Sequence, residues 1–298
     1  RQRMLAALQR QKPDRLPAAQ AYLCLFLADF ERVFYVEQYR QRLRGRSRYS
    51  VDHDEDVLFR AQAIYQSYGI FKVRPDWIEV YGGVGRNWAE QTDVVEEDGV
   101  LFFEDWSTGE RTPMLDKKSS LTDLWDNPAQ IRDKSDVDAQ LPVLTAEELL
   151  ASGEFDLMRQ VVADYGDRYF ITTILDTPFS DAYDLLGFQG LMVIQHDQPD
   201  LFHYLLELKL AQSKEVVAAC AACGIHGVYA EEVFTGADLI SPHSYDQFVY
   251  RYNLPYFRHM RSLGLLPIHY VCGNSIPRLE RMVEYDVAAV AVEEQPRT

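Results

Sequence analysis

Short apolar runs alternate with longer stretches of helical periodicity along most of the chain. Residues 169–175 form a continuous β-branched and aromatic run, whereas residues 201–223 place apolar side chains at helical spacing. Continuous apolar runs are typical of strands buried on both faces of a parallel sheet that is covered by helices. Six such strands are predicted, at residues 16–23, 77–81, 169–175, 228–232, 266–271 and 288–293.

This alternation fits two α/β architectures, a (β/α)8 TIM barrel and a doubly wound open sheet. Nucleotide-binding open sheets usually carry a Gly-x-Gly-x-x-Gly or Walker-type loop after a strand, and the sequence contains neither. We therefore predict a single TIM-barrel domain over residues 1–298. Because such a barrel has eight strands, the last two strands are expected to be missing from this sequence.

Residues 84–118 have a different pattern from the rest of the chain. Two short β-like runs, Val94–Val95 and Val100–Phe103, flank the dipeptide Asp98-Gly99. An Asp-Gly pair between such runs is a strong signal for a two-residue hairpin turn. A β-hairpin is therefore expected here, as an excursion after the second strand.

Composition narrows the functional classes. The formal net charge of −16 argues against binding to nucleic acid, which requires a positive surface. The apolar runs are too short to span a membrane, and no signal-peptide core is present at the start. Four cysteines do not form a secreted disulfide framework, so a cytoplasmic protein acting on a small molecule is expected. A homodimer is compatible with the sequence, which does not determine the oligomeric state.

Candidate functional residues follow from the position of the strand ends, because parallel α/β folds bind ligands at the carboxyl ends of their strands. We predict catalytic roles for Glu232 and Asp176, although a turn-capping role suits Asp176 equally. Substrate-binding residues are predicted at the ends of four strands, although the tyrosines among them are also compatible with core packing. They are Tyr22, Tyr81, Tyr270 and Asn274.

A zinc site is the most specific of these hypotheses. Imidazole and thiolate are preferred zinc ligands, so His269 and Cys272 could bind the metal, with Glu232 as third ligand from the neighbouring strand. Residues three apart on a regular strand face opposite sides, so this site requires the strand to bend or to end by Val271. The alternative is a buried strand-end thiol and a histidine that is hydrogen-bonded to a helix.

Several segments resemble the uroporphyrinogen decarboxylase superfamily. Gln2–Leu8 and Lys12–Pro17 are similar to its opening, and Leu239–Pro242 and Leu254–Tyr256 to a central segment. Pro267–Asn274 resembles its strand that ends in Cys-Gly-Asn. The resemblance implies a TIM barrel.

The resemblance also distinguishes two branches. Uroporphyrinogen decarboxylases carry an Arg-Gln-Ala-Gly-Arg segment after the first strand, whereas this chain has Ala21–Phe26 without arginine. The other branch, corrinoid-linked methyltransferases, binds zinc through His-x-Cys and a later cysteine. Cys272 matches that motif, but Tyr270 stands at the histidine position and His269 precedes it by one residue.

The branch favoured by this resemblance implies a methyltransferase. It would move a methyl group between a small methylated substrate, such as a methoxylated aromatic or a methylamine-like compound, and a corrinoid carried by a partner protein. Zinc is the implied metal. A uroporphyrinogen decarboxylase-like decarboxylase and a non-catalytic binding barrel are the alternatives.

Overall fold

The computed structural model describes residues 1–19, 27–69, 75–114 and 131–292. They form two compact units, each discontinuous in sequence, where the sequence predicts one barrel domain. Unit 1 comprises the described parts of 1–119, 147–171 and 223–225, and unit 2 those of 120–146, 172–222 and 226–298. Each unit is described by itself.

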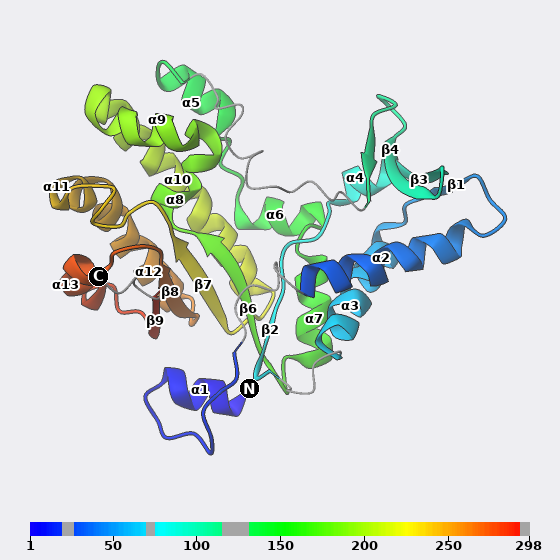
Figure 1. Cartoon of the computed structure of the whole chain (residues 1–298), viewed down its shortest axis with the longest axis horizontal. Helices are drawn as coiled ribbons and strands as arrows, with labels where there is room; N and C mark the ends of the chain where they lie inside the picture. The colour runs from blue at the N-terminus through cyan, green and yellow to red at the C-terminus, as the bar shows by residue number, and fades with distance from the viewer. Residues whose placement is uncertain (20–26, 70–74, 115–130, 293–298) are drawn as a thin grey trace. The chain divides into compact units, whose positions relative to one another are not determined.

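Unit 2 is built on a parallel sheet. Its strands are β6 (Phe170–Asp176, whose first two residues belong to unit 1), β7 (Gly227–Glu232), β8 (Leu266–Val271) and β9 (Ala289–Val292), and they lie side by side in chain order (Figure 1). These four strands confirm four of the six predicted ones within one or two residues. Parallel strands in chain order that are connected by helices form a TIM-barrel-like architecture.

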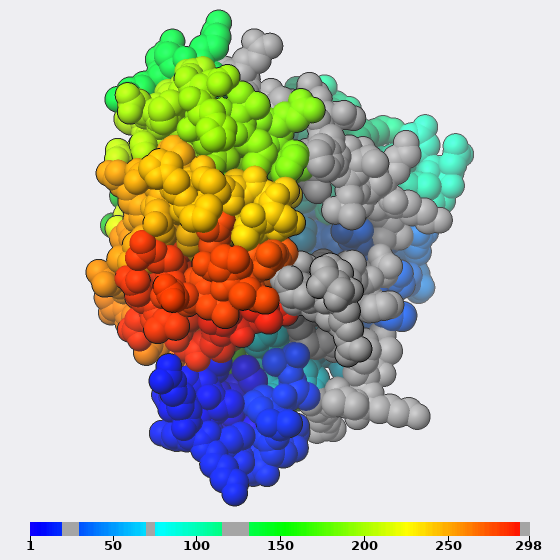
Figure 2. Space-filling view, turned by 60° about the vertical axis from the view of Figure 1, so that its left-hand side comes forward, coloured from blue at the N-terminus to red at the C-terminus, as the bar shows by residue number. Residues whose placement is uncertain are grey.

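Helices connect these strands. The connections are α8 (Pro178–Asp181), α9 (Tyr183–Asp197) and α10 (Pro199–Ala222) before β7, then α11 (Pro242–Ser244), the π-helix η2 (Tyr245–Tyr250) and α12 (Arg251–Ser262) before β8, then the 3-10 helix η3 (Ile276–Arg278) and α13 (Leu279–Val283) before β9. Helix α5 (Lys134–Gln140) precedes them in the chain. Phe179, Phe202, Leu205 and Val249 form part of a fully buried core. Figure 2 shows the orange-to-red end of this unit as one continuous surface.

The helical segment that precedes β8 is irregular. It begins as the π-helical turn η2 and continues as α12. Pro255 inside α12 has no backbone N–H, so it cannot donate to the carbonyl of Arg251 four residues earlier. The helix ends before Gly264, whose φ of +80° favours glycine.

Unit 1 contains an antiparallel sheet and several helices. They are α1 (Gln2–Leu8), α2 (Leu27–Leu43), β1 (Arg48–Ser50), α3 (His53–Gly69), β2 (Trp77–Glu79), α4 (Arg86–Glu90), β3 (Thr92–Glu97), β4 (Val100–Asp105), β5 (Arg111–Pro113), α6 (Ala146–Ser152) and α7 (Asp156–Tyr165). The antiparallel strand order is β1-β3-β4-β5. Strands β3 and β4 form a hairpin at Asp98-Gly99, and both turn residues have positive φ, as a type I′ turn requires.

Strand β2 pairs within unit 1. It lies beside the start of β6, where the Phe170 N–H donates to the Asp76 carbonyl at 3.1 Å. The first predicted strand, residues 16–23, is not observed over 16–19, and its remainder lies outside the described residues. Among the described helices, none is both long and apolar enough to cross a membrane.

A buried carboxylate links α2 to α3 in unit 1. Asp56 is fully buried and accepts hydrogen bonds from the hydroxyls of Tyr35 and Tyr39, the latter at 2.7 Å. Arg60, one helical turn later, donates from Nε at 2.6 Å. The helix pair therefore depends on one acceptor that serves three donors.

We predict that Asp56→Ala destabilises unit 1 by about 3–5 kcal/mol, because it leaves buried donors without an acceptor. Urea unfolding followed by circular dichroism measures the effect. Asp54→Ala, on the exposed side of the same helical turn, is the matched control and should stay near the wild-type value. Equal stability of the two variants would contradict this account of the helix pair.

Candidate functional site

The strand register places four side chains together on one face of the parallel sheet. Asp176 of β6 is opposite Glu231 of β7, and Glu231 is opposite Tyr270 of β8. Partner residues of neighbouring parallel strands face the same side, and residues two apart on one strand do so as well. Tyr229 therefore also lies on this side. We call these four residues the Asp176 face.

The two tyrosines of the Asp176 face stack on each other. The ring centroids of Tyr229 and Tyr270 are 5.4 Å apart, with an interplanar angle of 27°. Both side chains are largely buried, whereas Asp176 at the strand end is exposed. The face therefore combines an aromatic floor with carboxyl groups at the carboxyl ends of the strands.

The carboxyl group of Asp176 has an unusual protonation state. Surrounding protein atoms reduce its hydration, although the side chain remains accessible, and this burial is the largest cause that raises its pKa to about 7. The negative charges of Glu231, Asp181 and Asp184 act in the same direction and outweigh the opposing effect of Lys209. Lys209 itself forms an ion pair with Asp181 at 3.1 Å. Asp176 therefore carries its proton about half the time at neutral pH.

The opposite face of the same strands holds Glu232 and His269. Both are fully buried, and His269 Nε2 lies 2.9 Å from Glu232 Oε2. Glu232 also accepts from Thr235 Oγ1 at 2.7 Å and from Asn253 Nδ2 of α12 at 2.6 Å. The ring of His269 packs against Phe257 of α12 at 4.9 Å. The predicted direct catalytic role of Glu232 is therefore not supported, because its carboxylate is enclosed beneath a helix.

Hydrogen bonding assigns the tautomer of His269. Its Nδ1 atom is buried and has no partner among the described residues. A buried N–H without an acceptor is costly, whereas Nε2 faces the Glu232 carboxylate. We assign Nε2 as the ring nitrogen that donates to Glu232.

The structure does not bring Glu232, His269 and Cys272 together as the predicted zinc site. Within the described residues, no three His, Cys, Asp or Glu side chains are arranged so that they could hold a metal ion. Strand β8 stays regular to Val271, so His269 faces α12 while Cys272 continues the alternation of Tyr270. The described residues therefore do not fit the implied zinc. The alternative holds only in part, because His269 packs on Phe257 of α12 but is hydrogen-bonded to Glu232 of β7, and Cys272 is only partly buried.

Three of the four predicted substrate-binding residues are not part of the Asp176 face as defined above. Tyr22 lies outside the described residues. Tyr81 belongs to unit 1, is 41% exposed and donates its hydroxyl to Glu79. Asn274 follows β8, and its carbonyl accepts from the Ala237 N–H at 3.0 Å. Of these three, the structure places only Asn274 at the loops next to the Asp176 face.

Glycines allow the loops after β7 and β8 to approach closely. A Cβ atom on Gly236 would lie 2.6 Å from Asp238 Oδ1 and 3.2 Å from the Asn274 nitrogen. Gly273 has a φ of +76°, a conformation that other residues rarely adopt. This contact fixes the position of Asn274 relative to the end of β7.

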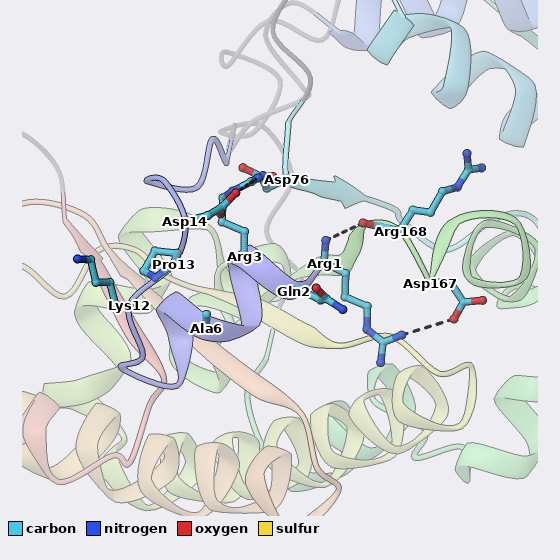
Figure 3. Close-up of a pocket in the computed structure, with 10 residues that line it drawn as sticks. All are labelled: Arg1, Gln2, Arg3, Ala6, Lys12, Pro13, Asp14, Asp76, Asp167 and Arg168. Carbon is cyan, nitrogen blue, oxygen red and sulfur yellow. Dashed lines mark hydrogen bonds and ion pairs between the residues drawn. The ribbon is translucent and has the colours of Figure 1, made fainter.

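A separate hollow of about 600 Å³ lies in unit 1, at the amino end of β2 (Figure 3). Its charged residues largely pair with each other. Arg3 forms a bidentate contact with Asp14, at 2.6 and 2.8 Å, and also binds Asp76. Arg1 faces Asp167 at 3.5 Å. This arrangement ties α1 to β2 and has the character of a structural ion-pair network.

The sequence-based prediction missed Glu231 and Tyr229. Glu231 and Glu232 are adjacent on a strand and so face opposite sides, and the prediction selected Glu232. The relevant signal was the alternation on β8, which places Tyr270 and Cys272 on one side and His269 on the other. Register with β7 then assigns Glu231 to the side of Tyr270.

Comparisons with known proteins agree with this fold. The family model described as uroporphyrinogen decarboxylase (URO-D) matches residues 127–297. Among solved structures, a methyltransferase from Methanosarcina mazei has a TM-score of 0.60 at 15% sequence identity, covering 97% of this chain and 74% of that one. No curated protein matches. The structural likeness concerns the fold, while the family match spans more than half of the sequence and confirms the resemblance. The chain therefore belongs to the uroporphyrinogen decarboxylase (URO-D) family.

Proposed function

We propose that this chain is a methyltransferase that moves a methyl group from a small methoxylated aromatic substrate to a corrinoid carried by a partner protein. The observation that carries the proposal is Asp176, an accessible carboxyl group whose pKa of about 7 keeps a proton available at neutral pH. Family membership and the methyltransferase of similar fold support the same reaction class. Closure of the sheet into an eight-stranded barrel is part of this proposal.

Demethylation of an aryl methyl ether requires a stabilised leaving oxygen. The reduced corrinoid would supply the electron pair that attacks the methyl carbon. As the methyl–oxygen bond breaks, its electrons stay on the oxygen, which takes the proton of Asp176. Asp176 becomes a carboxylate beside Glu231, and this repulsion favours its reprotonation from solvent.

Aromatic side chains give this face its substrate preference. Tyr229 and Tyr270 provide stacked rings on the same face of the sheet as the proton donor, and aromatic rings pair favourably in offset or tilted geometries. A bound ring would place its ether oxygen toward the strand ends, where Asp176 lies. No metal ligand set is required, because the proton stabilises the developing charge.

The decarboxylase alternative fits this face less well. Decarboxylation of a polycarboxylate ring needs cations that bind the substrate carboxylates. Two of the four residues of the Asp176 face are acidic, and the nearby Lys209 is paired with Asp181. A substrate with several carboxylates would therefore meet repulsion.

Single-turnover experiments with reduced cobalamin test the proposal. Methoxyphenols and methylamines are offered in parallel, and formation of methylcobalamin and of the demethylated product is measured. We expect turnover of the methoxyphenols. Decarboxylation of a tetrapyrrole without methyl transfer would overturn the proposal in favour of the decarboxylase, and the absence of both reactions would favour a binding barrel.

Asp176 as proton donor predicts a pH profile. The rate should be high below pH 7 and fall roughly tenfold per unit above it, because the protonated form is then depleted. Asp176→Asn should lower the rate about 10²- to 10⁴-fold. Asp197→Asn, at the exposed end of α9 and not among the groups that shift the pKa of Asp176, serves as the control with a near-normal rate. A wild-type rate that rises through pH 7 would rule out this role of Asp176.

The raised pKa of Asp176 also predicts a pH-dependent stability. Unfolding restores the ordinary pKa of about 4, so between pH 4 and 7 the folded state binds more protons than the unfolded state. The stability of the wild type should therefore fall as pH rises over this range. The stability of Asp176→Asn should lack this pH dependence, so the variant should gain stability relative to the wild type as the pH rises toward 8. Urea unfolding at several pH values measures it, and identical pH dependence of wild type and variant would refute it.

A further inference from the structure

The buried residues behind the sheet have no role in the proton transfer described above. Glu232 and His269 alternate along their strands with Glu231 and Tyr270, which are on the Asp176 face. We propose that Glu232 and His269 are positioning residues, which set the orientation of Glu231 and Tyr270 from the helix-covered side of β7 and β8. The use of that face rests on the proposed function, whereas the geometric coupling does not.

The hydrogen bonds of Glu232 join three separate elements. Its carboxylate binds His269 of β8, Asn253 of α12 and Thr235 of the loop that follows β7. The bonds come from a strand, a helix and a loop, so the end of β7 cannot rotate without breaking one of them. Because the Glu232 carboxylate is fully buried, losing one of these hydrogen bonds would be energetically costly.

The backbone around Glu232 is held as well. Its carbonyl accepts from the Cys272 N–H at 3.0 Å, and the carbonyl of Glu231 accepts from the Thr177 N–H at 2.8 Å. Pairing with both neighbouring strands therefore continues to the end of β7. The fixed backbone of this segment therefore sets the direction in which the Glu231 side chain points.

The ring of His269 is fixed by packing. It lies 4.9 Å from the ring of Phe257 and 5.4 Å from that of Tyr285. Tyr285 in turn contacts the hydroxyl of Tyr245 at 3.1 Å. Burial, together with the nearby Glu232 carboxylate, raises the pKa of both tyrosines, so they stay protonated.

Arg278 completes the buried cluster. It is 2% exposed, donates to the carbonyl of Ile240 at 2.7 Å and stacks 4.5 Å from the ring centre of Tyr245. Its guanidinium group faces the Tyr245 ring in the geometry of a cation–π contact. Arg278 therefore ties Tyr245 to the backbone at Ile240.

The titration of Asp176 reports the position of Glu231, because Glu231 is the largest electrostatic cause of the raised pKa. Carbon-13 NMR of labelled aspartate carboxyl groups measures this titration without any substrate. His269→Phe keeps a ring but removes the donor to Glu232. We expect the Asp176 titration to move down by about half a unit or more, as Glu231 leaves its place.

Two variants separate positioning from general loss of stability. His269→Gln retains a donor for Glu232 and should restore the titration to about 7. Phe257→Leu loosens the packing around His269 without removing a hydrogen bond, and should lower stability while leaving the titration unchanged. A shift in Phe257→Leu equal to that in His269→Phe would overturn the proposal.

A double-mutant cycle identifies Glu231 as the mediator. In a Glu231→Gln background, His269→Phe should cause no further shift, and an undiminished shift would contradict the proposal. If His269→Phe does not fold, Thr235→Val removes a single donor from Glu232 and should give a smaller shift in the same direction. An unchanged titration in the folded Thr235→Val variant would overturn the proposal. Since no turnover is measured, these outcomes are independent of whether methyl transfer occurs.

Discussion

A fully buried carboxylate constrains the whole functional end of unit 2. Removing Glu232 from water is expensive unless each lone pair finds a donor, and the chain meets this requirement with His269, Asn253 and Thr235. Each donor comes from a different element. The position of α12, the register of β7 against β8 and the path of the following loop are therefore linked by one group.

The two faces of β7 and β8 carry polar groups with different environments. On the helix side the polar groups are enclosed and mutually satisfied, so they are poorly placed to react with a ligand. On the other side, burial and secondly the neighbouring acids raise the pKa of an accessible carboxyl group to about 7. Alternation along a strand thus places a rigid support directly behind a reactive surface.

Much of the fold could be predicted from the sequence, because buried parallel strands are recognisable as continuous apolar runs. Five of the six predicted strands are present, and Asp98-Gly99 forms its turn. Residues 16–19 show the limit, since a short apolar run entered through Pro17 gives no information about a pairing partner. The candidate site was harder to predict, because Glu231 and Glu232 differ only in the face that they occupy. That choice depends on inter-strand register, which adjacent residues in a sequence do not reveal.

The contact between the loops that contain Gly236 and Gly273 limits how this family member can diversify. A Cβ atom at Gly236 would press on Asp238 and on the backbone of Asn274, and Gly273 has a backbone conformation that other residues rarely adopt, so substitution at either position is costly. New specificities would have to arise at strand-end side chains such as Tyr229 and Tyr270, where a change of volume alters the floor and leaves the backbone intact. Changes in ligand preference on this surface are therefore expected to arise by substitution of its aromatic side chains.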